Sequence, residues 1–381
     1  SKGVQHIEGI IVTRLRAKET PSNSLVLKEE LKARNFGQDM PTLLEFTPSV
    51  VTTSDAGAGI GYSGIRIRGV DASRINVTIN GIPVNDPESH DVYWVNMPDL
   101  VGSVENIQIQ RGVGSSTNGA AAFGASLNIK TSDIRSKAYA RTDLSAGSFG
   151  TLKGTLQAGT GLLNGKFSLD ARLSQIQSDG YLDRATSNLS SMGLTATYLT
   201  KRSIWKAVVL KGEERTYQAW YGTPESRING SVSEMQEFIN RNFSSKKDAD
   251  NLLNSGRTYN YYTYDNQTDN YTQDHLQLIT NHRLTDVWNL DLNAHYTYGR
   301  GYFEEFRPGS NMSNYIINSR ETADVIRRKW LDNDFYGSTF ALNYAGSQKF
   351  KFTFGGAWNR YVGRHFGVLV DPSPGTEWYR S

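Results

Sequence analysis

The run Trp288-Asn289-Leu290-Asp291-Leu292-Asn293-Ala294-His295-Tyr296 determines how the second half of this chain folds. Apolar and polar residues alternate through it, so that every second side chain is apolar. Successive side chains of a β-strand point to opposite faces, and a period of two therefore predicts a strand with one apolar and one polar face. Tryptophan and tyrosine stand at the two ends of the apolar series, where the interface belts of a membrane-spanning strand are enriched in them.

Similar alternation recurs along the chain from Lys137 onward. Stretches of about ten residues are separated in turn by short turns and by long polar loops, which is typical of the hairpins of a membrane barrel. We expect short turns at 162–165, 200–203, 285–286 and 346–347, and the longest outer loops at 216–270 and 302–328, with 377–381 in a further outer loop. The pattern predicts roughly nine antiparallel strands, near 137–146, 151–160, 165–177, 189–199, 203–215, 271–283, 287–299, 329–345 and 349–363.

That number of strands is too small for a closed, plugged barrel. Closed bacterial barrels are even-numbered and the plugged transporters have about 22 strands, so we expect this chain to hold only the first part of one. A large soluble β-protein is the alternative, because soluble antiparallel sheets alternate as well. The apolar faces repeatedly begin or end in aromatic residues such as Trp205, Trp288 and Trp358, which favours the membrane interpretation.

Composition excludes several classes of protein. The formal net charge is +3 over 381 residues and the basic residues are scattered, so no basic stripe for a nucleic-acid backbone is expected. The chain has no cysteine, which excludes disulfides, thiolate metal sites and cysteine nucleophiles. A mean hydropathy of −0.50 does not exclude a barrel, because a transmembrane strand needs only every second residue to be apolar. No arrangement suggests a nucleophile with its base, so we predict neither an enzyme nor a resident cofactor.

Residues before about Asp133 are rich in glycine and in short β-branched runs. Three pieces follow one another there: Met40 to Val50, a stretch that contains a leucine, a proline and a final valine; Ile65 to Gly69, followed by Ile75 to Asp86 with the turn Asn80-Gly81; and Val104 to Gly112, which leads to the glycine-rich return Gly119 to Ile129. Asn-Gly is itself a strong hairpin signal. Together with Glu8 to Thr13, these pieces resemble the plug domain of the TonB-dependent receptors, over most of residues 8 to 131.

The resemblance implies a fold and a location. It implies an α+β plug domain inside the lumen of an antiparallel membrane β-barrel, in the outer membrane of a Gram-negative bacterium. The expected domains are an N-terminal segment at 1–13 with a candidate TonB box, the plug at 14–133, and the first part of the barrel with its extracellular loops at 134–381.

The candidate TonB box consists of Glu8, Gly9, Ile10, Ile11, Val12 and Thr13. In the family, this peptide is captured as an added strand by the inner-membrane energy-transducing protein, which makes a TonB-type protein the first predicted partner. β-Branched residues favour extended backbone, and strand addition needs main-chain hydrogen bonds and side-chain pockets. An ordinary edge strand is the alternative.

Four charged residues are candidates for docking the plug inside the barrel: Arg66, Arg68, Glu105 and Arg111. The resemblance implies that residues of this kind hold the plug against the barrel wall. Charged hydrogen bonds suit that role, because water can replace them when the plug moves. The alternative is that they form ion pairs within the plug itself.

The candidate ligand residues come from loops of both parts: Asp86, Glu88, His90, Tyr93, Trp94, Trp220 and Tyr221. Aromatic platforms with polar edges suit a bulky, partly planar ligand such as an iron chelate, haem or a corrinoid. Loops rich in tyrosine and asparagine that touch no ligand are the alternative. His90 has no second histidine in view as a haem ligand, and the aspartates near residue 269 lack EF-hand spacing, so no metal site of the protein's own is predicted.

The predicted function is TonB-dependent import of a scarce, bulky nutrient across the outer membrane. A ferric siderophore or another iron complex is the first candidate, and the transported ligand would then contain iron, or cobalt in the case of cobalamin. Import of cobalamin or haem by the same mechanism is an alternative, and a passive porin or surface adhesin is an alternative of another class. The expected partners are a TonB-type protein, the small-molecule metal chelate and outer-membrane lipid, with a surface lipoprotein as a further candidate.

Overall fold

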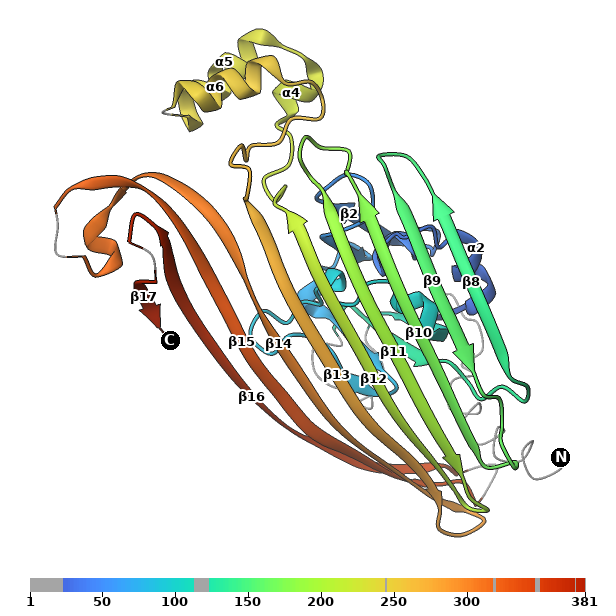
Figure 1. Cartoon of the computed structure of the whole chain (residues 1–381). Coiled ribbons are helices and arrows are strands. Elements are labelled where there is room, and N and C mark those ends of the chain that lie inside the picture. The colour runs from blue at the N-terminus through green and yellow to red at the C-terminus, as the bar shows by residue number, and fades with distance from the viewer. Residues whose placement is uncertain are drawn as a thin grey trace.

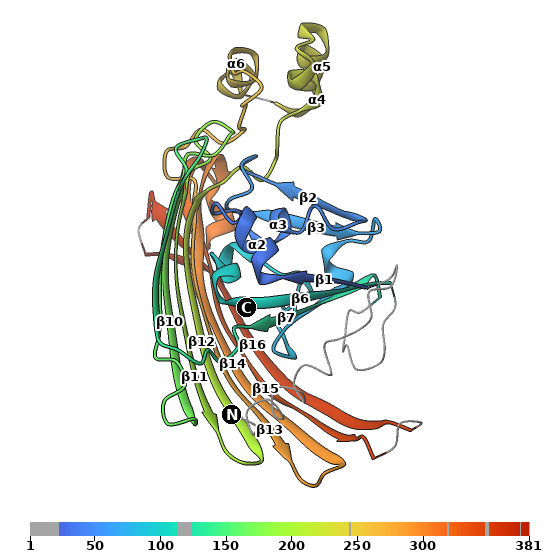
Figure 2. The ribbon, with the colours of Figure 1, turned by 90° about the vertical axis from the view of Figure 1, so that its right-hand side faces the viewer.

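The computed structural model describes residues 23–112, 123–243, 245–317, 320–346, 350–373 and 375–380. The candidate TonB box at residues 8–13 lies outside this part of the chain. A small N-terminal domain lies against the concave face of a long, curved sheet of ten strands (Figures 1 and 2). In the part of the chain that the structure describes, no helix is long and apolar enough to cross a membrane.

The N-terminal domain is built on a five-stranded sheet in the order β1-β6-β7-β4-β5, with a separate hairpin of β2 and β3. Strands β4 and β7 run parallel, and the other neighbours in the five-stranded sheet are antiparallel. Its elements are β1 Asn23–Leu27, α2 Lys28–Arg34, α3 Met40–Leu43, β2 Val50–Ser54, β3 Ser63–Ile67, η1 Ala72–Arg74, β4 Ile75–Ile79, β5 Ile82–Pro83, η2 Trp94–Asn96, η3 Leu100–Ser103, β6 Val104–Arg111 and β7 Ala125–Thr131.

β-Branched residues make up most of this domain's core. Ile75, Val77 and Ile79 of β4 pack with Ile107 and Ile109 of β6, and all five are at least 98 % buried. The predicted hairpin at Asn80-Gly81 is present between β4 and β5. Both residues have positive φ, 57° and 81°, which is the geometry that a two-residue turn between antiparallel strands requires.

The ten-stranded sheet consists of consecutive antiparallel neighbours from β8 to β17. Nine of them overlap the nine predicted strands. They are β8 Tyr139–Ala146, β9 Leu152–Gly159, β10 Phe167–Ser178, β11 Ser187–Leu199, β12 Ser203–Tyr217, β13 Thr268–Arg283, β14 Trp288–Asn311, β15 Thr322–Tyr344 and β16 Phe352–Asp371, and they are followed by the short β17 Glu377–Arg380.

Two predictions about the loops were wrong. Most of the predicted loop at 302–328 is strand, because β14 continues to Asn311 and β15 already begins at Thr322, with the short helix η5 Met312–Tyr315 between them. Residues 377–380, predicted as loop, pair with β16 as β17. Strand pairing continues beyond the alternating residues because a ladder of main-chain hydrogen bonds does not depend on apolar side chains.

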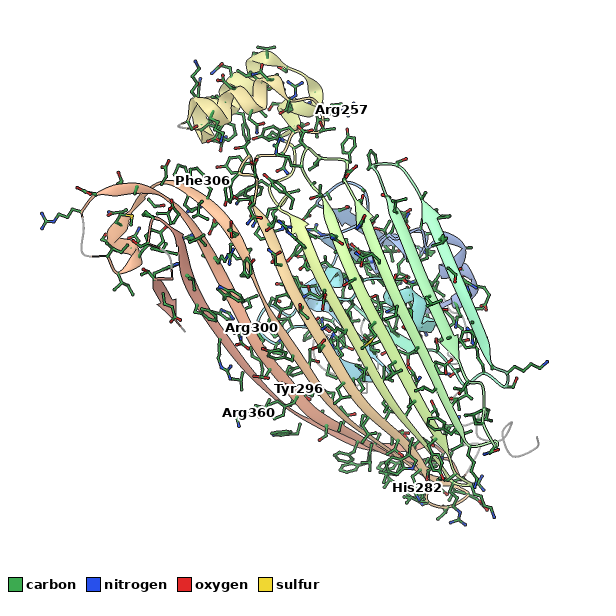
Figure 3. The ribbon with its side chains drawn as sticks, in the orientation of Figure 1. Arg257, His282, Tyr296, Arg300, Phe306 and Arg360 are labelled. Carbon is green, nitrogen blue, oxygen red and sulfur yellow. The ribbon has the colours of Figure 1, made fainter. Side chains whose placement is uncertain are left out.

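The loop between β12 and β13 contains three helices, α4 Glu225–Asn229, α5 Val232–Asn242 and α6 Lys246–Asn254. Met235, Ile239, Leu252 and Tyr259 form a small core among them. Figure 1 shows these helices beyond one end of the sheet, which we call the loop end; the opposite end, with the short connections, is the turn end. Figure 3 shows Arg257 beyond the loop end and His282 at the turn end.

The two faces of the sheet have different side chains, as the alternation predicts. An apolar band of exposed residues crosses the convex face: Leu144, Leu156, Leu173, Met192, Leu278, Leu292 and Phe340. Toward the turn end, Phe167, Tyr198 and Trp205 lie opposite one another on three adjacent strands. An apolar band bordered by aromatic residues is typical of a sheet that faces lipid.

Leu292 and Asn293 provide a matched test of the two faces. Leu292 is 44 % exposed on the convex face, whereas the Asn293 amide donates to the Thr339 hydroxyl at 2.9 Å on the concave face. We expect Leu292→Asp to hinder membrane assembly, because a charge in the lipid-facing band costs on the order of 1 to 2 kcal/mol, and Asn293→Asp to be mild. The heat-modifiable fraction of each variant on a gel measures assembly, and equal fractions would contradict the assignment of the faces.

Candidate functional site

A cavity of about 410 Å³ lies between the N-terminal domain and the concave face of the sheet. The domain contributes the connection between β2 and β3 and the segment between β5 and η3. The sheet contributes strands β13 to β16 and the loop between β12 and β13. Residues that line it include Asp55, Tyr62, Asp86, Asp91, Tyr93, Asn96, Trp220, Asp269, Tyr271, His275, Tyr302, Phe303, Lys329, Asn333 and Tyr361. Two hollows of about 520 and 530 Å³ lie among convex-face residues such as Leu144 and belong to the apolar band instead.

Aromatic rings connect the cavity with the loop end. The Trp220 ring packs edge-on against Tyr62 of the N-terminal domain, with 5.7 Å between ring centroids, and against Phe303 of β14 at 5.4 Å. It also contacts Tyr262 at 6.5 Å, and Tyr262 in turn packs on Tyr221 at 5.3 Å. These rings therefore form a continuous path from the exposed loops to the N-terminal domain.

Carboxylates supply most of the charge in the cavity. Asp55, Asp86 and Asp91 come from the N-terminal domain and Asp269 from β13, where it accepts a hydrogen bond from the Tyr62 hydroxyl. Burial raises the pKa of Asp55 to about 6. Burial, and then the negative charges of Asp71 and Asp86, raise the pKa of Asp91. A pKa of about 6 still leaves Asp55 mostly ionised at pH 7, so its carboxylate carries negative charge in the cavity at neutral pH.

The loop that carries Asp86 is held in one conformation by its own side chains. Asp86 Oδ1 accepts from the main-chain N–H of Glu88 at 3.0 Å and of Ser89 at 2.8 Å. Asn85 anchors the loop to β4, accepting from Val77 N–H and donating to the Ile75 carbonyl, both at 2.8 Å. The position of the Asp86 carboxylate is therefore fixed before any ligand arrives.

The structure places the seven candidate ligand residues in different surroundings. Asp86, Tyr93 and Trp220 line the cavity. Glu88 lies beside it, accepting from the Tyr361 hydroxyl at 3.1 Å and lying 3.0 Å from His365 Nε2, so that it joins the loop to β16.

The other three candidates are not among the lining residues. Trp94 is only 3 % exposed and packs in the core of the N-terminal domain. His90 closes the loop with a positive φ of 63° and accepts from the Asn85 amide through its carbonyl. Tyr221 is 70 % exposed and packs on loop tyrosines. A ligand-binding role for these residues remains a prediction.

A buried ion cluster attaches the N-terminal domain to the sheet. Asp99, whose side chain is 0 % exposed, lies 2.9 Å from Lys153 Nζ of β9 and 3.3 Å from Arg172 of β10. Its carboxylate also accepts from the Thr155 hydroxyl at 2.9 Å and from the Asn35 amide at 2.8 Å. The buried charges are thus both paired and hydrogen-bonded, which offsets the cost of removing them from water.

The pKa of Asp99 follows from these neighbours. Burial by itself raises it, but the positive charges of Arg172 and Lys153 and the hydrogen bonds outweigh burial, and the pKa lies below its ordinary value of 3.8. Ionised Asp99 therefore contributes its full stabilisation of the attached domain at pH values above the ordinary pKa of 3.8. The contribution is lost as the pH falls through the lowered value.

Further polar contacts surround the ion cluster. Gln157 donates to the Gly102 carbonyl at 2.7 Å and Arg172 Nε donates to the Ser103 hydroxyl at 2.9 Å. Lys206 of β12 donates to Thr131 Oγ1 at 2.7 Å, and the Asn80 amide donates to Gln277 at 3.0 Å. Each of these bonds can be exchanged for one to water when the interface opens. Apolar contacts accompany them, since Ile60 and Val95 of the domain pack with Ile176 and Leu189 of the sheet.

The four predicted docking residues make their identified contacts within the N-terminal domain. Arg66 pairs with Asp71 at 3.1 Å, and Glu105 pairs with Lys28 at 3.1 Å. Arg111 donates to the Pro48 carbonyl at 3.0 Å, and Arg68 donates to the carbonyl of Arg111 at 3.4 Å. Docking by these four residues remains a prediction, whereas Asp99, Lys153 and Arg172 join the two parts in the structure. The sequence indicates only the face of the sheet residues, since Lys153 and Arg172 occupy polar positions of alternating strands, and it does not indicate their partner.

Comparisons with known proteins agree with this geometry. Residues 16–126 match the family model described as TonB-dependent Receptor Plug Domain. Residues 16–126 are therefore a plug domain of this family. None of the curated proteins matches the sequence.

The complete described fold resembles solved receptors. The open form of the ferric-catecholate import receptor Fiu from E. coli K12 has a TM-score of 0.68 at 16 % identity, with 96 % of this chain and 53 % of that chain covered. The unliganded ferric citrate transporter FecA has a TM-score of 0.67 at 13 % identity, with 95 % of this chain and 51 % of that chain covered. The copper transporter OprC has a TM-score of 0.67 at 15 % identity, with 93 % of this chain and 49 % of that chain covered. The chain thus spans about half the length of these structures.

The predicted fold class is confirmed. A TonB-dependent receptor plug lies against an antiparallel sheet that matches part of a receptor barrel. The family consists of receptors and transporters rather than enzymes.

Removing the charge of Asp99 tests whether the ion cluster holds the plug. Asp99→Asn leaves Lys153 and Arg172 buried without their counter-charge, a loss of about 3 to 5 kcal/mol. We expect the receptor to assemble with normal heat-modifiable mobility but to admit large antibiotics that the unaltered receptor excludes. Asp143→Asn, on β8 at the edge of the sheet, is the control and should change neither property. If the Asp99→Asn receptor still excludes large antibiotics, contacts other than the ion cluster hold the plug.

Proposed function

We propose that this chain is part of a receptor that imports a bulky metal chelate across the outer membrane of a Gram-negative bacterium, using energy from a TonB-type protein. The observation that carries the proposal is the cavity shared by the plug and the sheet. A ligand bound there touches both parts at once, so its binding can alter how the plug sits in the barrel. An iron complex is the first candidate substrate, since Fiu and FecA are described as receptors for ferric complexes.

The polar interface supports a mechanism in which the plug moves. The Asp99 cluster and the bonds around it hold the plug through groups that water can replace when the plug moves. Pulling on the N-terminal segment that precedes β1 would act on the same domain that lines the cavity. Capture of Glu8 to Thr13 by a TonB-type protein would thus connect an energy source to the ligand site.

A passive porin or an adhesin is the less favoured alternative. A porin needs an open lumen, whereas here a folded plug lies against the concave face of the sheet (Figure 2). Cobalamin or haem would be imported by the same mechanism, and a panel of ligands distinguishes them from iron chelates.

Ile10→Pro in the complete receptor tests energy coupling. Proline lacks the N–H that strand addition requires, so we expect uptake of radiolabelled ferric chelates to fall by at least about tenfold while binding to whole cells is retained. Ile10→Val keeps the donor and the β-branched side chain and should transport normally. The panel contains ferric hydroxamates, ferric citrate, haem and cobalamin. Undiminished uptake by Ile10→Pro would overturn the proposed role of this segment.

A further inference from the structure

The cavity between the plug and the sheet carries an excess of negative charge. Four carboxylates line it, those of Asp55, Asp86, Asp91 and Asp269, whereas Lys329 is the one lysine or arginine among its described lining residues. Lys329 Nζ itself lies over the Phe303 ring, 5.6 Å from the centroid. An anionic ligand would therefore meet mostly like charge, which is unfavourable.

Two buried polar side chains indicate that the cavity is built for a ligand with polar groups. Asn96 is 7 % exposed and His275 is 5 % exposed, and both line the cavity. In the described part of the chain, Asn96 Oδ1 and His275 Nε2 have no hydrogen-bond partner. His275 is fixed through its other ring nitrogen, which lies 3.0 Å from the Thr297 hydroxyl. A polar group of a bound ligand can supply the hydrogen bond that each of these two atoms lacks.

Ammonium and guanidinium groups are the cations that the described lining of the cavity suits. Among the described residues, no group of three or more histidine, aspartate or glutamate side chains has the geometry to hold a metal ion. The cavity offers carboxylates and the faces of Tyr62, Tyr93 and Trp220 instead. Carboxylates pair with ammonium or guanidinium groups, and aromatic faces attract the same cations.

We propose, resting on the import function above, that the chelate accepted by this cavity bears a cationic group that lies between the aromatic rings and the carboxylates of Asp86 and Asp91. The fixed loop around Asp86 orients one of these carboxylates in advance. Complexes with several negative charges, such as a ferric tris-catecholate, are rejected by the same carboxylates. The charge of the ligand, rather than the metal, is what the cavity selects.

Three ferric complexes with one chelating core test this selection. Ferrioxamine B carries a free ammonium group on a neutral ferric trihydroxamate; its N-acetyl derivative is neutral and its N-succinyl derivative is anionic. Binding to the complete, purified receptor is measured by quenching of tryptophan fluorescence. We expect the cationic complex to bind at least about tenfold more tightly than the anionic one, with the neutral complex between them.

The variants assign the selection to the cavity. Asp86→Asn with Asp91→Asn should remove the difference among the three complexes, whereas Asp143→Asn, on β8 at the edge of the sheet, should preserve it. Equal affinities in the unaltered receptor, or tighter binding of a ferric tris-catecholate than of ferrioxamine B, would overturn the charge selection and leave import in place. Failure of all the ferric complexes to bind would overturn the proposed ligand class itself.

Discussion

The buried carboxylate of Asp99, held between Lys153 and Arg172, is the contact on which the arrangement of the two domains depends. A sheet that is apolar on its convex face must place its polar side chains on the concave face, because successive residues of a strand point in opposite directions. Those side chains need partners, and the plug supplies them. A charged, hydrogen-bonded interface of this kind is specific in position, yet its groups can be transferred to water when the plug moves.

The cavity between the plug and the sheet is a consequence of the same arrangement. Where the plug meets β9 and β10 the interface is filled by the ion cluster, but toward β13 to β16 the plug loop around Asp86 stands away from the sheet and leaves a space lined by both. Glu88 spans the two parts through Tyr361 and His365 of β16. A bound ligand therefore competes for, or adds to, contacts between plug and sheet, which is how binding can be communicated to the plug.

Local sequence patterns predicted the elements better than the contacts between them. The strand around Leu292 and the turn at Asn80-Gly81 depend only on residues that are close together in the sequence, and both were found as predicted. Asp99 lies 54 residues before Lys153, with a left-handed backbone at φ 48° that no local pattern indicates, so its partners could not be inferred. Of the candidate ligand residues, Asp86, Tyr93 and Trp220 were placed in the cavity, whereas Trp94 has a side chain that packs inward.

The proposed import requires the plug to move away from the sheet at the Asp99 contact, and a reversible cross-link there tests this movement. A side chain at Gly193 of β11 would meet Ser103 of the plug, with 2.8 Å between the added Cβ and Ser103 Oγ, and the chain has no cysteine of its own. We expect Ser103→Cys with Gly193→Cys to bind ferric chelates but not import them when oxidised, and to import them again after reduction. Full uptake by the oxidised receptor, with the cross-link complete, would contradict the account.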